Sequence, residues 1–164
     1  MSTEPRITMQ EALGQLKRNE LEAMEFYTGI ASNSRDTDVA RLMRHLADFE
    51  KGHHESLCTI EERFDGAGSR AVKSAATGSL PDGLRIALPD LKGTESLLAT
   101  IEAAIGLELR AQHSLESVAE LSTETGYRQF FLEMAAEERG HYLLLKDVAW
   151  SLTNFGSWES KARH

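Results

Sequence analysis

The chain has 164 residues, which suits a single domain with a hydrophobic core, and its fractions of apolar and charged residues, 41% and 27%, are ordinary for a globular protein. A net charge of −8 without any basic block argues against a nucleic-acid partner. No apolar run approaches the roughly 20 residues that cross a bilayer, and no secretory signal opens the sequence. We therefore expect a cytoplasmic protein without a membrane partner.

Four segments with helical periodicity of apolar residues are predicted as helices: about 7–33, 37–65, 94–122 and 125–153. Thr8 and Glu11 have the spacing of a capping box at the start of the first segment, and Thr94 is a candidate N-cap for the third. The short polar stretches 33–37 and 122–126 predict tight turns. The four helices are therefore expected to form two antiparallel hairpins.

A long crossover, residues 66–93, joins the two predicted hairpins, and a tail follows at 154–164. The crossover is rich in Gly, Ser and Pro, and its LPDGLRIAL stretch predicts a short helix with Pro81 in the first turn. At roughly 3.3 Å per residue it is long enough to span a helix of about 45 Å. Two hairpins joined by one long crossover predict an all-α, ferritin-like antiparallel four-helix bundle that forms a single domain over 1–164.

Each predicted helix has an apolar face that is interrupted near its middle by a glutamate, and the second and fourth helices add a histidine one turn later. These interruptions are Glu20, Glu50, His53, Glu108, Glu138 and His141. An offset of 88 residues carries the first three onto the last three, and it also carries Gly52 onto Gly140. The pattern indicates a duplicated hairpin. The repeated glycine indicates either close approach by a neighbour or inheritance from the duplicated ancestor.

The glutamates of each hairpin lie equally far from its turn, about 22 Å along the helix axis at ~1.5 Å per residue. Level packing of the hairpins therefore brings all six side chains into one layer. Four ionised carboxylates there would repel, and burying each would cost several kcal/mol without compensation. Protonation with pairing of carboxyls is one solution. Two divalent cations are the better one, because their charges balance.

Four carboxylates and two imidazoles suit two iron ions, with manganese possible and zinc less suited because it prefers fewer carboxylates in a tetrahedral site. A Glu together with Glu-x-x-His is the known pattern of di-iron bundles. A single Glu-x-x-His is usually a solvated pair on a helix surface. Here two copies share a register with two further glutamates, which favours a metal site.

Other side chains with chemical potential are given plainer interpretations. His45, His54 and His113 lie off the apolar faces and are expected at the surface. Tyr27 lies two turns beyond Glu20 on the same face, so it either packs in the core or hydrogen-bonds a ligand carboxylate. Cys58 is the only cysteine, which excludes an internal disulfide, a CxxC pair and a cysteine zinc cage. We expect a buried, unreactive thiol.

The sequence resembles the rubrerythrin branch of the ferritin-like superfamily. The resemblance rests on E-x-x-A-x-x-F-Y from Glu20 to Tyr27, a weaker echo AIGLELRA at 104–111, and the two Glu-x-x-His helices. It implies a carboxylate-bridged di-iron centre that reacts with hydrogen peroxide or dioxygen. By position, the six residues named above take the ligand roles. Ferritin-like bundles commonly pair, so a homodimer is a further implication.

Two departures from the family qualify what the resemblance implies. Full-length rubrerythrins append a rubredoxin domain with four cysteines that bind an electron-transfer iron, whereas this chain has only Cys58. Electrons would have to come from a separate donor protein. Rubrerythrins also tend to carry an extra carboxylate one turn before the ligand glutamate of the third helix. Ile105 stands there, which makes a plainer ferritin-type site more credible.

Three functional hypotheses follow. The leading one is a di-iron oxidoreductase that acts on peroxide or dioxygen. The second is an iron-binding or ferroxidase module for iron handling, without peroxidase turnover. The third is a structural bundle whose buried polar layer fixes the register of the helices, as buried polar groups do in some systems.

Overall fold

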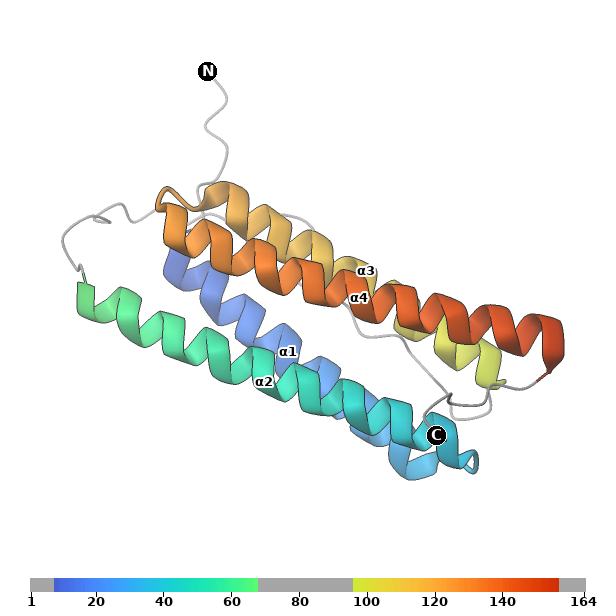
Figure 1. Cartoon of the computed structure of the whole chain (residues 1–164). Coiled ribbons are helices and arrows are strands. Elements are labelled where there is room, and N and C mark those ends of the chain that lie inside the picture. The colour runs from blue at the N-terminus through green and yellow to red at the C-terminus, as the bar shows by residue number, and fades with distance from the viewer. Residues whose placement is uncertain (1–7, 68–95, 157–164) are drawn as a thin grey trace, which may run out of the picture.

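The computed structural model describes residues 8–67 and 96–156. These residues form four helices and no strand: α1 (Met9–Asn33), α2 (Thr37–Ala67), α3 (Leu97–Leu121) and α4 (Thr125–Phe155). The helices lie alongside one another in a bundle (Figure 1). The predicted all-α, ferritin-like four-helix bundle is confirmed. Within the described ranges, no helix combines the length and apolar character needed to cross a bilayer.

Local hydrogen bonds determine where the first two helices begin. The side chain of Thr8 accepts from the backbone N–H of Glu11, and the side chain of Glu11 accepts from the backbone N–H of Thr8. The predicted capping box is therefore confirmed. At α2, a side-chain oxygen of Asp36 accepts from the N–H groups of Asp38 and Val39, at 2.9 and 3.0 Å. Both caps satisfy backbone donors that have no partner inside the helix.

In the second hairpin, a serine caps the start of α3 and a glycine follows the end of α4. The N-cap of α3 is Ser96, whose side chain accepts from the N–H of Ala99 at 3.2 Å, so the assignment of this role to Thr94 was wrong. At the end of α4, Gly156 has a φ of 70°, a left-handed conformation that glycine adopts without steric cost. The predicted helix in LPDGLRIAL, Thr94, and all of the predicted crossover beyond Ala67 lie outside the described residues.

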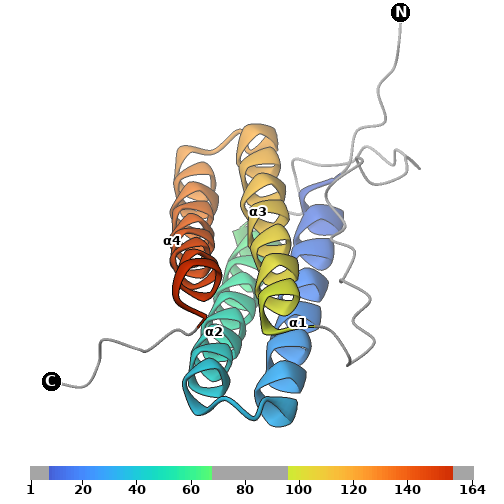
Figure 2. The ribbon, with the colours of Figure 1, turned by 90° about the vertical axis from the view of Figure 1, so that its right-hand side faces the viewer.

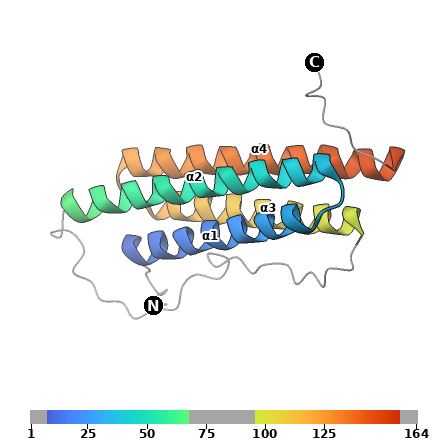
Figure 3. The same cartoon turned by 90° about the horizontal axis from the view of Figure 1, so that it is seen from below.

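The helices pack mainly as two hairpins, α1 against α2 and α3 against α4, and the hairpins contact each other mainly through α1 and α3, with side-chain contacts between α2 and α4 as well. Figure 2 shows α3 beside α1 in the end-on view. The view from below in Figure 3 shows the helices running alongside one another over most of their length. The alternation of apolar residues at three- and four-residue steps gives each helix the face that it buries in these contacts.

Two apolar clusters fill the interior. The Tyr27 cluster is centred on Tyr27, Val39, Met43, Leu46, Ile101, Leu145 and Val148. The Leu13 cluster is centred on Leu13, Leu16, Leu57, Leu115, Val118 and Phe131. Burying one such side chain contributes about 1.5–3 kcal/mol to stability. In each helix the predicted ligands lie at or near the point where one cluster gives way to the other, so the bundle consists of two apolar regions flanking a polar layer.

Candidate metal centre

The structure brings all six predicted ligand residues into this polar layer. Each of the four helices contributes one glutamate, and α2 and α4 each add the histidine of the following turn. All six are buried, with at most 8% of any residue exposed: Glu20, Glu50, His53, Glu108, Glu138 and His141. Six ionisable side chains at this degree of burial require compensation, because charged groups are almost never fully buried without partners.

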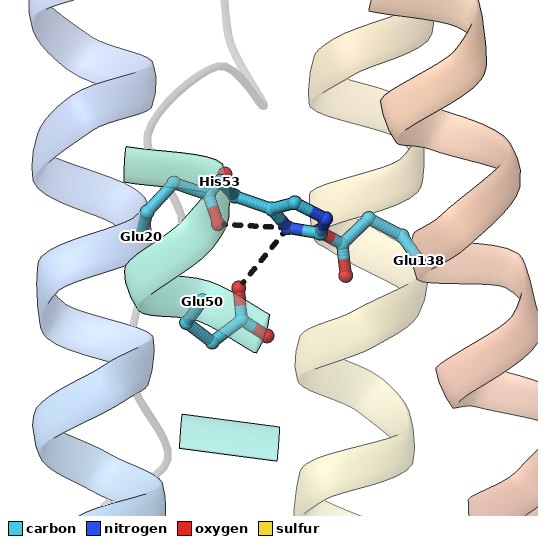
Figure 4. Close-up of side chains that lie close together, drawn as sticks. All are labelled: Glu20, Glu50, His53 and Glu138. Carbon is cyan, nitrogen blue, oxygen red and sulfur yellow. Dashed lines mark ion pairs between the residues drawn. The ribbon is translucent and has the colours of Figure 1, made fainter. Parts of the chain in front are cut away.

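One group of four, here called the first position, consists of Glu20, Glu50, His53 and Glu138. Its potential ligand atoms all lie within 4.8 Å of one another. The Nδ1 atom of His53 lies 3.7 Å from a Glu20 oxygen, 3.6 Å from a Glu50 oxygen and 2.8 Å from a Glu138 oxygen. Figure 4 shows these side chains pointing toward one another from three helices. Glu138 reaches the first position from the opposite hairpin.

A second group, the second position, consists of Glu50, Glu108, Glu138 and His141, again with ligand atoms within 4.8 Å of one another. The Nδ1 atom of His141 lies 3.4 Å from an oxygen of Glu108 and 3.4 Å from an oxygen of Glu138. Glu50 and Glu138 belong to both groups. They therefore lie between the two positions and could serve as ligands in both.

The hydrogen bonding of the layer is incomplete in a way that fits two cations. Six of its buried side-chain atoms lack a hydrogen-bond partner: Glu50 Oε2, His53 Nδ1, Glu108 Oε2, both Glu138 oxygens and His141 Nδ1. All six lie in His–Glu ion-pair contacts of 2.8 to 3.7 Å, but none of these contacts has the geometry of a hydrogen bond. A buried polar atom without a hydrogen bond costs about 1–3 kcal/mol, so this layer calls for an explanation. Each is an atom that can ligate a metal. Two divalent cations would balance the charge of four carboxylates, and these atoms could serve as their ligands.

The carboxyl groups of the layer respond to burial in different ways. Burial raises the pKa of Glu50 well above its ordinary value, and the charge of Glu138 raises it further. Burial also raises the pKa of Glu108, to about 8. Burial acts on Glu138 in the same direction, but its close contacts with the rings of His141 and His53 outweigh that effect and lower its pKa. Glu138 therefore carries its charge at neutral pH.

The two histidines counter this charge. Burial disfavours a charged ring, but the carboxylates of Glu108 and Glu138 outweigh it and raise the pKa of His141 to about 9. Glu138 and Glu20 raise the pKa of His53 in the same way, against the effect of burial. Without cations, the layer is therefore compensated by bound protons. Cation binding would displace those protons, as is usual for carboxylate and imidazole ligands.

Tyr27 makes the hydrogen bond that the sequence left as one of two options. Its hydroxyl, on α1, donates to an oxygen of Glu108 on α3. The side chain is also fully buried in the Tyr27 cluster, so it packs and hydrogen-bonds at the same time. Burial and the nearby carboxylate of Glu108 raise the pKa of Tyr27 well above its ordinary value, which keeps the phenol protonated.

Sequence reasoning missed two residues at the edge of the layer. An oxygen of Glu137 lies 2.9 Å from Nε2 of His53, although 59% of the Glu137 side chain is exposed. On the other side, the ring of Phe49 lies 4.8 Å from the ring of His141, between centroids. The 88-residue offset carries Phe49 onto Glu137, but neighbouring pairs such as His54 and Tyr142 differ as well, so the sequence did not mark these two residues as distinctive.

The remaining chemically active side chains lie away from the layer. His45 and His113 are exposed, as predicted, and His54 is half-buried. Cys58 is half-buried rather than buried, with its sulfur 3.9 Å from the ring nitrogens of His54, so the expectation of a buried thiol was wrong. Its helical position turns it partly toward solvent, one residue beyond Leu57.

The structure also describes Gly52 and Gly140, which the sequence repeat pairs, and Ile105, where the sequence departs from the family that it resembles. Gly52 and Gly140 are exposed, and a Cβ atom at either would meet nothing within 4 Å. The structure therefore gives no support to close approach as the reason for these glycines. Ile105 is half-buried and packs against the Tyr27 cluster. It adds apolar surface to this cluster and offers no ligand atom.

The chain is similar to a solved structure and matches a protein family. Among curated proteins, none matches the chain. A hypothetical protein from Pyrococcus furiosus has a similar structure, with a TM-score of 0.71 and 22% sequence identity over 93% of this chain and 94% of that one. This similarity supports the fold. The family model for rubrerythrin matches residues 11–149, a range that contains all four helix cores and the whole polar layer. The chain belongs to the rubrerythrin family.

Proposed function

We propose that the chain is a di-iron carboxylate oxidoreductase that reduces hydrogen peroxide or dioxygen with electrons from a separate donor protein. The observation that carries the proposal is the pair of buried four-residue groups that share Glu50 and Glu138. Two positions with common carboxylates are suited to a pair of ions acting together, whereas a single structural ion needs only one such group. Manganese fits the same donor set, and zinc fits it less well.

An iron pair held there would supply two electrons to peroxide, which takes up two protons as its O–O bond breaks and leaves as two waters, and the donor would then return two electrons. The residues of the chain hold the ions and control access. Glu50 and Glu138 would contribute to both ion positions, and Glu20, His53, Glu108 and His141 would complete the two sets. Tyr27 orients Glu108 through its hydrogen bond. The flanking apolar clusters exclude bulk water from the layer.

The electron source is proposed to be external because the chain has a single cysteine, Cys58. An iron site of the four-cysteine type therefore cannot form within this sequence. The donor would have to approach the bundle closely enough to pass electrons to the layer. The predicted electron-donor protein thus remains part of the proposal.

The test begins with anaerobic loading of the metal-free protein with ferrous iron. Peroxide or dioxygen is then added by rapid mixing, and the near-ultraviolet absorption of ferric iron is followed with time. We expect two ferrous ions per chain to be oxidised quickly by at least one of the two oxidants. Failure to bind iron, or binding without oxidation by either oxidant, would refute the proposed activity.

A second candidate function is ferroxidase activity in iron handling. It is favoured by Ile105, which places an apolar side chain where related proteins tend to have an extra carboxylate. The two functions differ in turnover. With an added reductant and a donor protein, an oxidoreductase consumes many equivalents of peroxide per chain, whereas a ferroxidase module stops after the iron supplied has been oxidised.

A further inference from the structure

The 88-residue offset makes the two metal positions directly comparable, because it carries each ligand of one hairpin onto a ligand of the other. The residues that surround the ligands do not follow this repeat. Glu137 contacts His53, whereas its counterpart Phe49 contacts His141. Tyr27 hydrogen-bonds Glu108, whereas its counterpart in the repeat is Leu115, which has no hydrogen-bonding group. The two positions thus have matching ligands and different surroundings.

At the first position, Glu137 determines how His53 presents its ring. When Nε2 carries the proton, its N–H donates a hydrogen bond to the Glu137 oxygen 2.9 Å away, and Nδ1 keeps a free electron pair. That atom is the one that faces Glu20, Glu50 and Glu138. A carboxylate on the far nitrogen of a ligand histidine fixes its tautomer and orientation and makes it a stronger donor. Glu137 also places a further negative charge beside this position.

At the second position, the corresponding neighbour is Phe49, which provides neither a hydrogen-bond acceptor nor a negative charge. The phenyl ring of Phe49 offers no acceptor for an N–H of His141, and 51% of this residue is exposed. The hydroxyl of Tyr27 donates to Glu108, which draws electron density away from a carboxylate of the same position. Both differences weaken the ligands of the second position relative to those of the first.

We propose that the two positions bind metal unequally, that the first position is filled before the second, and that Glu137 is the positioning residue that creates this order. The inference rests on the proposed metal site. It adds that the duplicated ligand set is loaded in a defined sequence. Outer partners of ligand histidines typically change metal affinity by about 10–100-fold, so a single carboxylate is sufficient to separate the two steps.

The first experiment titrates metal-free protein with Mn²⁺ under anaerobic conditions and follows the free ion by its electron paramagnetic resonance signal. The variant E137A should weaken the tighter of two binding steps by about 10–100-fold. The variant E137Q keeps an acceptor for the ring N–H and should restore part of the loss. The control E133Q removes a charge from an exposed residue one turn earlier on α4 and should leave both steps unchanged.

The second experiment assigns each step to a position with a matched pair, E20Q and E108Q, which remove equivalent glutamates from the two groups. One ion should still bind tightly to E108Q, whereas E20Q should retain only the weaker step. Circular dichroism establishes that each variant is folded. This pair separates unequal positions from simple repulsion between two ions in equal positions, because only unequal positions make the two variants differ.

Several outcomes would overturn the inference while leaving the metal site intact. Equal affinity of E20Q and E108Q for their remaining ion would do so. So would an E137A protein that binds Mn²⁺ as the unaltered chain does, or one that changes no more than E133Q. Absence of Mn²⁺ and Fe²⁺ binding by the unaltered chain would instead count against the proposed metal site, and the inference would fall with it.

Discussion

The hairpin of α1 and α2 and the hairpin of α3 and α4 bring equivalent residues to the polar layer, two glutamates and a histidine each. Their surroundings differ: the first hairpin supplies Tyr27 and Phe49, and the second supplies Leu115 and Glu137 at the same places in the repeat. The candidate ligand set is thus symmetrical while the hydrogen bonds around it are not. A duplicated hairpin would account for the matching candidate ligands, and the residues that differ between the halves are expected to give each half its own role.

The largest expected effect comes from a residue that both halves use. Glu138 belongs to both positions, so E138Q should abolish tight binding at both, whereas E20Q should leave one ion per chain. Metal analysis after dialysis against Fe²⁺ or Mn²⁺ measures the number of ions retained. The control E133Q should retain two. An E138Q protein that also retains two ions would show that the positions do not share this carboxylate.

The next effect concerns the pH dependence of the metal-free protein. The folded-state pKa of His141 is raised from 6.5 to about 9, and that of Glu108 from 4.5 to about 8. In both cases the folded state binds more protons than the unfolded chain, so stability is lost as pH rises toward the folded pKa. Between pH 6 and pH 9, thermal unfolding should shift down by roughly 5 °C or more.

The same melting curves test whether cations replace the bound protons. The lowered pKa of Glu138 acts only below its ordinary value near pH 4.5, so it does not affect this range. With saturating Mn²⁺, the downward shift between pH 6 and pH 9 should shrink or reverse, because cation binding is favoured when the ligands are deprotonated. A metal-free protein that is more stable at pH 9 than at pH 6 would contradict the proton-compensated layer.

A smaller effect is expected from the tyrosine that only the first hairpin provides. The variant Y27F keeps the buried ring and removes the donor to Glu108, which leaves a buried oxygen without its partner. The free energy of unfolding should fall by about 1–2 kcal/mol. Denaturant titration measures it, and Y142F, at a half-buried tyrosine of α4, is the control. Equal effects of the two variants would show that the hydrogen bond adds no stability.

The smallest effect tests a feature that the halves share. Because a Cβ at Gly52 or Gly140 would meet nothing within 4 Å, and because Ala favours helix over Gly by about 1 kcal/mol, G52A and G140A should each stabilise the chain by up to this amount. Thermal melts measure the change. Destabilisation by both variants would reveal a contact on this surface outside the described residues, such as one with a second copy of the chain.

Most of the fold followed from the spacing of apolar residues. Helical periodicity gave the helices, and the polar turns gave the hairpins, because both signals are local in the sequence. Register along the bundle followed from the equal distances of Glu20 and Glu50, and of Glu108 and Glu138, from their turns. The N-cap of α3 was misassigned because Thr94 and Ser96 are both suitable capping residues, and sequence alone does not choose between neighbours.

The surroundings of the candidate site were less predictable. The structure brings the six predicted ligands together, and their ligand roles stay predictions. Glu137 escaped notice because it points about 100° away from Glu138 around the helix, so its contact with His53 depends on how α2 and α4 face each other. The contact of Tyr27 with Glu108 likewise depends on how α1 lies against α3, which no periodicity encodes.

The way contacts are distributed among the helices also bears on how the chain folds. Contacts within each hairpin join residues that are close in sequence, which favours rapid formation of the hairpins as separate units. Each candidate metal position takes three residues from one hairpin and one carboxylate from the other, Glu138 or Glu50. Neither position therefore exists until the hairpins have docked. Metal uptake is expected to be the last event of maturation. It would hold the two hairpins together, because each ion would bind one carboxylate from the opposite hairpin.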